Sequence, residues 1–400
     1  MNEGGMKLIK KGLKGLFVII IFLSLTGIGS SWTVSKRITW NSGTSSPNDM
    51  ARDLSNNLYI VWTDNTSGNT EVYFKKSTDN GVTWIMHKRL TYTPVPSGPV
   101  TIGVDSSNII HIIWVDGYND IWDLYYKNST DGGSTWSSRV RLTWGQTGKA
   151  YTPSMVVDKN DNIHVVWTIT LHATTNSEIF YKNSTDGGIN WSPLNRLTYM
   201  AENSKEPVIA TDLPKGTPYV HVIWSDRGTG NYEIYHKRST DLGSSWSAPN
   251  RLTWTIGVSN YPAVAVAYDQ GVHIVWMDSS SGNFDIYHKR SGDRGVTWSS
   301  AKRLTWNTGS SMYPKVSPGL TQTVYVVWDD QPASASFGNH EIYFKQSTDS
   351  GINWGASVRL TYTSGESYYP VAEKGSAGNL HLLWARGSAP AYEVYYKRKD

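Results

Sequence analysis

The chain has 400 residues and no cysteine, which excludes disulfide and thiolate chemistry. Tryptophan and tyrosine are abundant, with 19 and 24 copies against 7 phenylalanines, so much of the apolar mass carries a polar group. The formal charge is +4 and falls to +1 without residues 1–30, which hold four Lys and one Glu, and no basic stripe is visible that would predict a nucleic-acid partner.

The first 30 residues have the pattern of an export signal. Lys7, Lys10, Lys11 and Lys14 precede an apolar run at residues 16–25, and small residues follow it. This arrangement predicts a signal peptide over residues 1–30. The alternative is an uncleaved membrane anchor, although the run is short for a full span. Both interpretations place a single domain, residues 31–400, outside the cytoplasm, secreted or at the cell surface, with membrane contact only through an uncleaved segment.

Residues 32–400 repeat one pattern of four short strands. In the copy that spans 262–306, we expect strands at 262–267, 273–276, 285–289 and 298–305. The second strand recurs seven times as a run such as HIVW that ends in Trp, and the third strand also recurs seven times. Runs that are apolar on both faces are typical of strands buried between two neighbours, as in the blades of a propeller.

An eight-residue phrase, Ser-x-Asp-x-Gly-x-(Thr/Ser/Asn)-Trp, lies between the third and fourth strands and occurs six times at a spacing of 52 to 56 residues. Its Asp can accept backbone N–H groups a few residues on, its Gly can take a positive φ, and its Trp supplies a large apolar plate. A structural role in the turn is therefore expected for the six aspartates, which are Asp79, Asp131, Asp186, Asp241, Asp293 and Asp349.

This phrase resembles the Asp box, or BNR repeat, of sialidase-like β-propellers, and the resemblance covers residues 32–400. It implies a propeller fold. It does not imply a reaction, because Asp boxes occur in enzymes, lectin-like proteins and scaffolds alike.

The fourth strand that the last repeat lacks is found at the other end of the chain. Residues 32–40 (WTVSKRITW) match residues 298–306 (WSSAKRLTW), so the Arg-(Leu/Ile)-Thr triplet occurs seven times. We therefore predict an all-β fold, a seven-bladed β-propeller of four-stranded antiparallel blades, whose ring is closed by the N-terminal strand completing the C-terminal blade. Sialidases of the Asp-box family have six blades, so the chain departs from them in the ring itself.

Repetition separates structural from functional candidates. A residue present in nearly every repeat is expected to support the blade, whereas a polar residue that stands alone on the face opposite the Asp boxes is a candidate for binding. Most histidines recur at two strand positions and are interpreted as aromatic rungs, so no metal site and no cofactor is expected. The solitary candidates are Tyr118, Trp122, His172, Arg227, His340 and Arg386.

An Asp also recurs two residues after the Trp of the second strand in five repeats, as Asp64, Asp116, Asp226, Asp278 and Asp330. We interpret it as the start of an Asx turn in preference to a ring of binding carboxylates. Repeats three and seven have Ile169 and Arg386 in its place.

The resemblance to sialidases implies three arginines that hold a substrate carboxylate, a Tyr nucleophile activated by a Glu, and an Asp acid/base. Only Arg227 and Arg386 are solitary arginines of the expected binding face, so the triad is one short. The Arg-Leu-Thr or Arg-Ile-Thr triplets also differ from the Arg-Ile-Pro signature of sialidases.

Tyrosines stand before three of the first-strand prolines, at Tyr261, Tyr313 and Tyr369. Their repetition favours a structural role. Glu206 or Glu366 could pair with one of them, without further support from the sequence.

The residue that closes the fourth strand is aromatic in all seven repeats: Trp40, Tyr92, Trp144, Tyr199, Trp254, Trp306 and Tyr362. Such plates suit the apolar faces of sugar rings, and seven weak sites would gain affinity through multivalency. Trp254 and Trp306 are therefore candidates for ligand binding. The alternative is that these rings are buried between blades.

These observations predict a secreted or cell-surface propeller that binds glycans without catalysis. A sialidase-like exo-glycosidase is the alternative, and a scaffold for an extracellular protein partner fits the same sequence. No catalytic residue is assigned.

Overall fold

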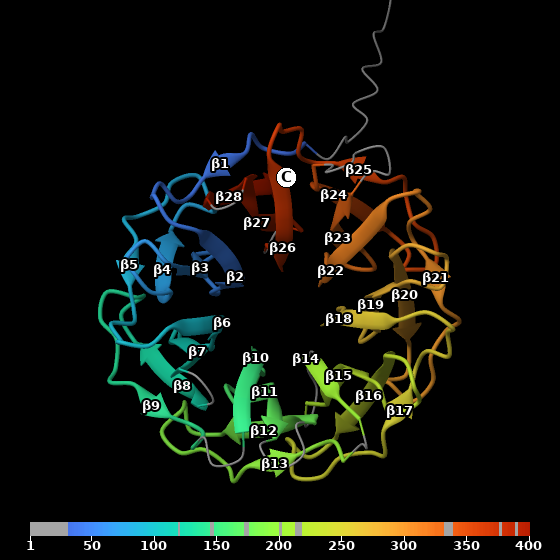
Figure 1. Ribbon diagram of the computed structural model, residues 1–400, viewed down its shortest axis with the longest axis horizontal. Helices are drawn as coiled ribbons and strands as arrows, with labels where there is room; N and C mark the ends of the chain where they lie inside the picture. The colour runs from blue at the N-terminus through green and yellow to red at the C-terminus, as the bar shows by residue number, and fades with distance from the viewer. Residues whose placement is uncertain are drawn as a thin grey trace, which may run out of the picture. The chain divides into compact units, whose positions relative to one another are not determined.

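The computed structural model describes residues 31–400 apart from 119–120, 145–147, 172–175, 200–201, 213–217, 332–338, 376–377 and 389–390. Trp32–Asp400 forms one compact unit. In it, seven four-stranded antiparallel sheets are arranged as blades around a common centre (Figure 1). Residues of the first strand of every blade line a central channel there. The predicted all-β, seven-bladed fold is confirmed. No helix in this described part is long and apolar enough to cross a membrane.

Each blade contributes four strands, counted from the channel outwards (Figure 1). The first strands of blades one to seven are β2 (Ser45–Arg52), β6 (Ser97–Val104), β10 (Gly148–Val157), β14 (Ser204–Thr211), β18 (Ser259–Val266), β22 (Ser310–Pro318) and β26 (Glu366–Lys374). The second strands are β3 (Leu58–Asp64), β7 (Ile110–Tyr118), β11 (Ile163–Leu171), β15 (Val220–Asp226), β19 (Val272–Asp278), β23 (Val324–Gln331) and β27 (Leu380–Ser388). The third strands are β4 (Glu71–Ser77), β8 (Ile121–Ser129), β12 (Ser177–Ser184), β16 (Glu233–Ser239), β20 (Asp285–Ser291), β24 (Glu341–Ser347) and β28 (Ala391–Lys399). The fourth strands are the two-residue strands β5 (Lys88–Arg89), β9 (Val140–Arg141), β13 (Asn195–Arg196), β17 (Asn250–Arg251), β21 (Lys302–Arg303), β25 (Val358–Arg359) and, for blade seven, β1 (Lys36–Arg37).

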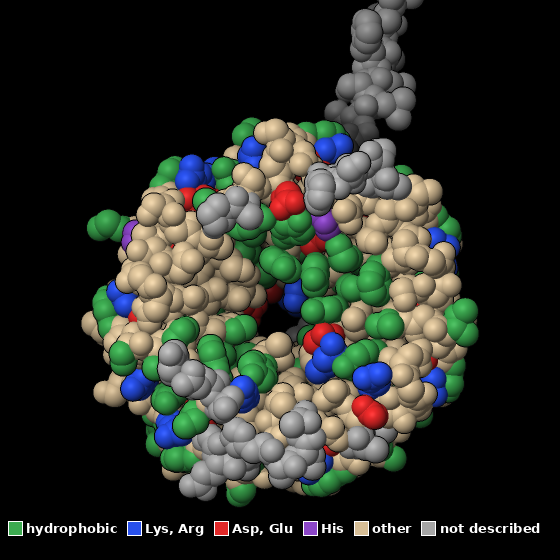
Figure 2. Space-filling view, viewed as in Figure 1, with side chains coloured by type: hydrophobic (Ala, Val, Ile, Leu, Met, Phe, Trp, Pro, Cys, Tyr) green, Lys and Arg blue, Asp and Glu red, His purple; other side chains and the backbone are tan. Residues whose placement is uncertain are grey.

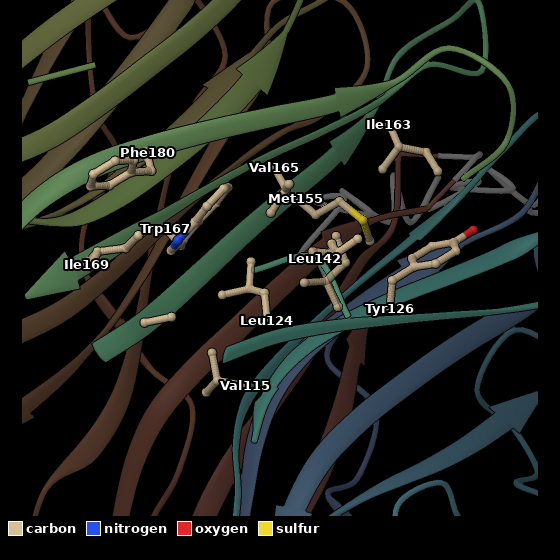
Figure 3. Packing of buried hydrophobic residues seen from close by; sticks show 12 residues of the cluster. Val115, Leu124, Tyr126, Leu142, Met155, Ile163, Val165, Trp167, Ile169 and Phe180 are labelled. Atoms are coloured by element: carbon tan, nitrogen blue, oxygen red, sulfur yellow. The ribbon is translucent and has the colours of Figure 1, made fainter. Parts of the chain in front are cut away.

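The second strands are buried because both of their faces contact other side chains. Each contains a tryptophan that is at most 2% exposed; these are Trp62, Trp114, Trp167, Trp224, Trp276, Trp328 and Trp384. Figure 3 shows one interblade core, where Val115 and Leu124 of blade two meet Val165 and Trp167 of blade three. The core is therefore a ring of apolar layers between blades.

The Arg-(Leu/Ile)-Thr triplet holds each fourth strand to its neighbours. In blade one, Arg89 forms an ion pair with Glu71 at 2.6 Å, and the N–H of Val72 donates to Thr91 Oγ1 at 2.8 Å. The carbonyl of the middle residue, Leu90, accepts a hydrogen bond from Lys127 of the next blade at 3.0 Å. Equivalent Arg–carboxylate pairs occur in all seven blades.

The six Ser-x-Asp-x-Gly turns fold in the same way. In the first, Asp79 Oδ1 accepts the N–H of Thr83 at 2.7 Å, and the N–H of Gly81 donates to Ser77 Oγ at 2.8 Å. In the second turn, hydrogen bonds from the side chain and N–H of Thr135 lower the pKa of Asp131 to about 2. Each carboxylate is thus engaged within its own turn.

An aromatic ring of the preceding blade packs against both the glycine and the tryptophan of each turn. Gly81 has φ 82°, and a Cβ there would lie 1.9 Å from the hydroxyl of Tyr396. Trp84 meets the same Tyr396 edge to face, with ring centroids 5.2 Å apart. This contact accounts for the aromatic residue at this third-strand position in every blade.

Blade seven is completed by both ends of the described chain. β1 pairs with β28, with Arg37 opposite Tyr395, and Trp32 forms a further bridge with Lys399. The Trp32 ring packs edge to face on Phe344 at 5.2 Å, the contact that a turn Trp makes in the other blades. The predicted ring closure is confirmed, and β1 covers the edge of β28.

Candidate functional site

The antiparallel topology separates the connections onto two faces of the ring. We call the face that carries the links between second and third strands and between blades the loop face, and the opposite face, with the Ser-x-Asp-x-Gly turns, the turn face. Figure 2 shows hydrophobic side chains gathered beside the central opening over β18, β22 and β26. An acidic and a basic group lie next to them near β14.

The first strands form the mouth of the channel on the loop face, and in every blade their pairing with the second strand shifts register there. In blades three to seven the pairing with the second strand shifts where a proline follows a residue of positive φ, because proline has no N–H for the ladder. The preceding residues have φ between 45° and 57°; they are Thr152, Glu206, Tyr261, Tyr313 and Tyr369. Bulky residues rarely take this conformation, and such strain is concentrated at functional sites.

Three of these residues form a tyrosine cluster at the mouth. Tyr313 lies between the other two, with its ring centroid 4.8 Å from Tyr261 and 4.9 Å from Tyr369, both edge to face. Tyr261 remains 37% exposed and Tyr369 46% exposed. Together with Lys315 they line a pocket of 260 Å³. Burial and the two neighbouring phenols raise the pKa of Tyr313, so its hydroxyl stays protonated at neutral pH.

Glu206 borders the tyrosine cluster on the side of blade four. Its Oε2 accepts the backbone N–H of Tyr261 at 3.0 Å and the hydroxyl of Ser225 at 3.2 Å, and Lys205 lies 3.4 Å from its Oε1. Burial and the Glu206 carboxylate raise the pKa of Tyr261. The mouth thus combines aromatic faces with phenol donors and one carboxylate.

A second pocket, of 390 Å³, adjoins the cluster between blades seven and one, and Tyr369 lines both pockets. The hydroxyl of Tyr392 donates to Glu366 Oε2 at 2.7 Å, and burial together with this carboxylate raises the pKa of Tyr392 to about 12. Tyr368 lies between Tyr392, at 6.1 Å, and His340, at 4.3 Å between ring centroids.

His340 is fixed by a buried carboxylate. Its Nδ1 lies 3.2 Å from Asp329 Oδ1, and the N–H of Tyr369 donates to Asp329 Oδ2 at 3.3 Å. Burial raises the pKa of Asp329, although His340 beside it acts in the opposite direction. This contact orients the backbone from which Tyr369 projects.

The channel below the mouth carries charged groups. Asp49, Arg52, Lys315, Glu373 and Lys374 are among the residues that line its 360 Å³ cavity. Figure 2 shows a basic side chain inside the central opening. Burial in this narrow space raises the pKa of Glu373 to about 7.

The raised pKa of Glu373 predicts a pH-dependent stability. The folded chain keeps this proton up to a pH of about 7, whereas an unfolded glutamate releases it near 4.5, so unfolding becomes easier as the pH rises through this window. Glu373→Gln is therefore expected to raise Tm by a few degrees at pH 8 and to change it little at pH 4. Thermal unfolding at both pH values measures this. An equal shift at the two pH values would show that the effect is not electrostatic.

The structure describes the side chains of four solitary candidates, and they lie at separate points. Among these four, only His340 contacts the mouth, through Tyr368. Trp122 is half-buried between blades two and three, 6.4 Å from Tyr151. Arg227 is exposed in the loop after β15. The guanidinium of Arg386 lies 5.0 Å from the ring centroid of Tyr395.

Two of the predicted residues fall outside what the structure describes. His172 lies in the undescribed segment 172–175. Tyr118 ends β7, and its side chain is likewise not described.

The aromatic residues that close the fourth strands are 59–74% exposed. The alternative that they are buried between blades is therefore wrong. Trp254 and Trp306 lie on the outer rim, each beside an arginine three residues earlier, at 5.7 Å from Arg251 and 6.0 Å from Arg303. Lys345 of the next blade lies 5.2 Å from the Trp306 ring. The rim and the mouth are thus two distinct aromatic surfaces.

The aspartates at the ends of the second strands are buried and serve their own blades. In blade four, Asp226 Oδ2 accepts Ser204 Oγ at 2.7 Å and Trp224 Nε1 at 2.9 Å, and its Oδ1 accepts the N–H of Gly228 at 2.9 Å. The last bond is the Asx turn expected from the sequence. Among the described residues, no group of three His, Cys, Asp or Glu side chains could hold a metal ion.

Sequence reasoning missed the tyrosine cluster because it treated repetition as a sign of structure. The available signal was that tyrosine precedes proline in only three neighbouring repeats, while Gly98, Thr152 and Glu206 stand before proline in three others. A residue confined to one arc of a ring marks a local surface. Lys315, which no other repeat has after its proline, was missed as well.

No family model matches the sequence, and no curated protein sequence matches it. Solved structures do match the fold. Polysaccharide lyase Uly1 superposes with a TM-score of 0.61 at 8% identity, covering 91% of this chain and 92% of the lyase. The Hadza microbial sialidase Hz136 gives 0.57 at 14% identity over 89% of this chain, which spans 66% of the sialidase. Penicillium chrysogenum α-L-arabinanase, complexed with arabinobiose, gives 0.52 at 14% identity, over 76% and 93% of the two chains. At these identities the similarity shows the propeller fold alone.

Proposed function

We propose that this chain is an exported propeller of the Asp-box type that binds carbohydrate, without catalysis, at the tyrosine-lined mouth of its channel. The observation that carries the proposal is the tyrosine cluster, Tyr261, Tyr313 and Tyr369, held at positive φ with ring surface left open to solvent. Aromatic walls with a few convergent polar groups are the usual composition of a small-molecule site. A sugar offers the complement, an apolar ring face and several hydroxyls.

Three further features support this function. The cluster is bordered by Glu206 on one side and by the Tyr392–Glu366 pair on the other, which supply acceptors and donors for hydroxyl groups. Two of the structurally similar proteins are a polysaccharide lyase and an arabinanase complexed with arabinobiose. The lysine-rich start and apolar run of residues 1–30 favour export, where glycans are accessible.

A glycan array that pairs acidic with neutral glycans tests the proposal on the purified chain. Tyr261→Asn and Tyr369→Asn remove the rings while Asn tolerates a positive φ, so the bulges are expected to persist. Each substitution should weaken retained binding about tenfold, or about 1.4 kcal/mol. Tyr268→Ala is the matched control, because Tyr268 is an exposed tyrosine of the turn face, between β18 and β19.

The outcomes separate the candidate functions. Binding that is unchanged in both mouth variants would exclude this site. If no glycan on the array is bound, a scaffold for an extracellular protein partner would be the better-supported function.

A sialidase-like exo-glycosidase is the second candidate, and the observation that favours it is the tyrosine–glutamate pair. Tyr392 donates to Glu366 at 2.7 Å beside a 390 Å³ pocket. Against it, Arg227 belongs to blade four, and Arg386, although it is in blade seven with this pair, does not line the pocket, because its guanidinium lies over the ring of Tyr395. Recovering the array glycans after incubation decides the matter, since release of a terminal sugar would replace the binding function with hydrolysis.

A further inference from the structure

We propose that the channel directly below the tyrosine cluster is an anion site, in which Lys315 binds the carboxylate or sulfate of a sugar whose ring rests on the tyrosines. This inference rests on the proposed carbohydrate function and names the class of ligand, an acidic pyranoside. Lys315 follows Pro314 on β22, one residue beyond the bulge that positions Tyr313. It lines both the 260 Å³ tyrosine pocket and the channel cavity, so it joins the two spaces.

The ammonium group of Lys315 has no partner among the described residues. It forms neither an ion pair nor a hydrogen bond there, in contrast to the lysines of the third strands, such as Lys345, which donates to Leu304 O at 2.6 Å. Burial lowers the pKa of Lys315 from its usual value, while Asp49 acts in the opposite direction. Lys315 is half-buried, and an anionic ligand would supply the partner that its ammonium group lacks.

Asp49 is the acidic group whose charge acts on the pKa of Lys315, but both of its carboxylate oxygens already accept hydrogen bonds. Its Oδ2 accepts Thr101 Oγ1 at 2.7 Å and the N–H of Ile102 at 3.0 Å, while its Oδ1 accepts the N–H of Met50 at 2.9 Å. These bonds fix the carboxylate against the wall of blades one and two. Asp49 is therefore not free to turn and form an ion pair with Lys315.

The repeat offers its own comparison for position 315. The residue after the first-strand proline is Val208 in blade four, Ala263 in blade five and Val371 in blade seven. A small or apolar side chain therefore satisfies the same backbone position. The lysine of blade six is not required by the bulge, which indicates that it was placed for its charge.

Two features select an acidic sugar over a free anion. The walls above Lys315 are aromatic and suit a ring, whereas a small inorganic ion would contact only the ammonium group. The channel also contains the charged side chains of Arg52, Lys374 and Glu373, which lie toward the turn face. Arg52 donates a hydrogen bond to the carbonyl of Lys374 at 3.0 Å. With Asp49 and Glu373 both ionised the channel still carries a net positive charge, which favours an entering anion.

A set of matched pyranosides tests this assignment. Methyl β-glucuronide, methyl β-glucoside and the 6-sulfate of the glucoside share one ring and differ in charge, and sodium acetate and sodium sulfate probe the anion alone. Ligand-observed NMR titration of the full chain gives each Kd. We expect the two charged pyranosides to bind at least about tenfold more tightly than the neutral one, as expected for a charge-assisted contact.

Substitutions assign the preference to Lys315. Lys315→Val reproduces blade seven, and Lys315→Gln retains most of the side-chain length; both should abolish the charge preference, measured as the ratio of the Kd of the neutral glucoside to the Kd of each charged pyranoside. Lys374→Gln removes one charge elsewhere in the channel and should leave the preference intact.

A charge preference that persists in both Lys315 variants would overturn the anion site but not the proposed carbohydrate function. Equal binding of acetate, sulfate and the charged pyranosides would overturn the sugar part of the assignment. A failure of all three pyranosides would instead remove the proposed function on which the inference rests.

Discussion

Removing residues 31–40 is expected to prevent the ring from folding to a stable monomer. This segment supplies the fourth strand of blade seven, and β28 would be left with an open edge. Ile38 is 1% exposed, and truncating a buried aliphatic residue alone costs about 2–5 kcal/mol. Glu393 would also lose Arg37, and a buried charge without its partner costs about 3–5 kcal/mol more. These costs together approach the whole stability of an ordinary domain, about 5–15 kcal/mol.

The matched control keeps every strand and changes only the connectivity. Trp32 and Lys399 are paired, so a short linker can join Asp400 to Ser31. New ends between Ile256 and Gly257 would open an exposed link between blades four and five. This circular permutant should unfold at nearly the Tm of the parent chain, whereas the deletion should elute as aggregate in size-exclusion chromatography. A deletion variant that remains monomeric with a parent-like Tm would show that closure by β1 contributes little.

The closure could be predicted because the repeat constrains each strand by contacts that leave a residue signature. Trp32 was matched to Trp298 by sequence, and it makes the same kind of edge-to-face contact, with Phe344 in place of His236. Arg37 and Thr39 bind Glu393 as their equivalents bind the third-strand carboxylate elsewhere. Local and interblade requirements point to one structure, so the pattern was sufficient.

The mouth could not be predicted in the same way, because its geometry depends on a register shift. Whether Tyr313 points into the channel or into an interblade layer is decided by the bulge before Pro314, which sequence spacing does not reveal. The pairing of His340 with Asp329 joins residues eleven positions apart across a long loop. The exposure of Trp306 likewise depends on tertiary packing at the rim.

Asp226→Ile is expected to destabilise blade four by about 3–5 kcal/mol, because it leaves two buried donors without an acceptor. Ser204 Oγ and Trp224 Nε1 both donate to this carboxylate, at 2.7 Å and 2.9 Å. Neither group has access to water, since Ser204 is fully buried and Trp224 is 1% exposed. We call this Ser–Asp–Trp arrangement the polar clamp.

Blade three shows how the polar clamp can be replaced. Ala150 and Ile169 occupy the Ser and Asp positions, pair directly and are each 1% exposed. The double variant Ser204→Ala/Asp226→Ile copies this pair into blade four. It should be more stable than Asp226→Ile alone by about 1–2 kcal/mol, because one of the two orphaned donors is removed. Urea unfolding of the parent, both single variants and the double variant gives the coupling energy, and simple additivity would contradict the polar clamp.

Blade seven allows the opposite test, in which the missing acceptor is restored. Arg386 stands at the Asp position, and both Ser367 Oγ and Trp384 Nε1 are buried there without a partner among the residues that the structure describes. Arg386→Asp should therefore stabilise the chain by about 1–2 kcal/mol, since it supplies the missing acceptor. Blade three exchanged both members of the pair and keeps one unpaired donor, Trp167 Nε1, whereas blade seven exchanged one member and has two unpaired donors among the described residues. A stabilising Arg386→Asp would show that blade packing did not select this arginine, and would direct the search for its role to the loop face beside Tyr395.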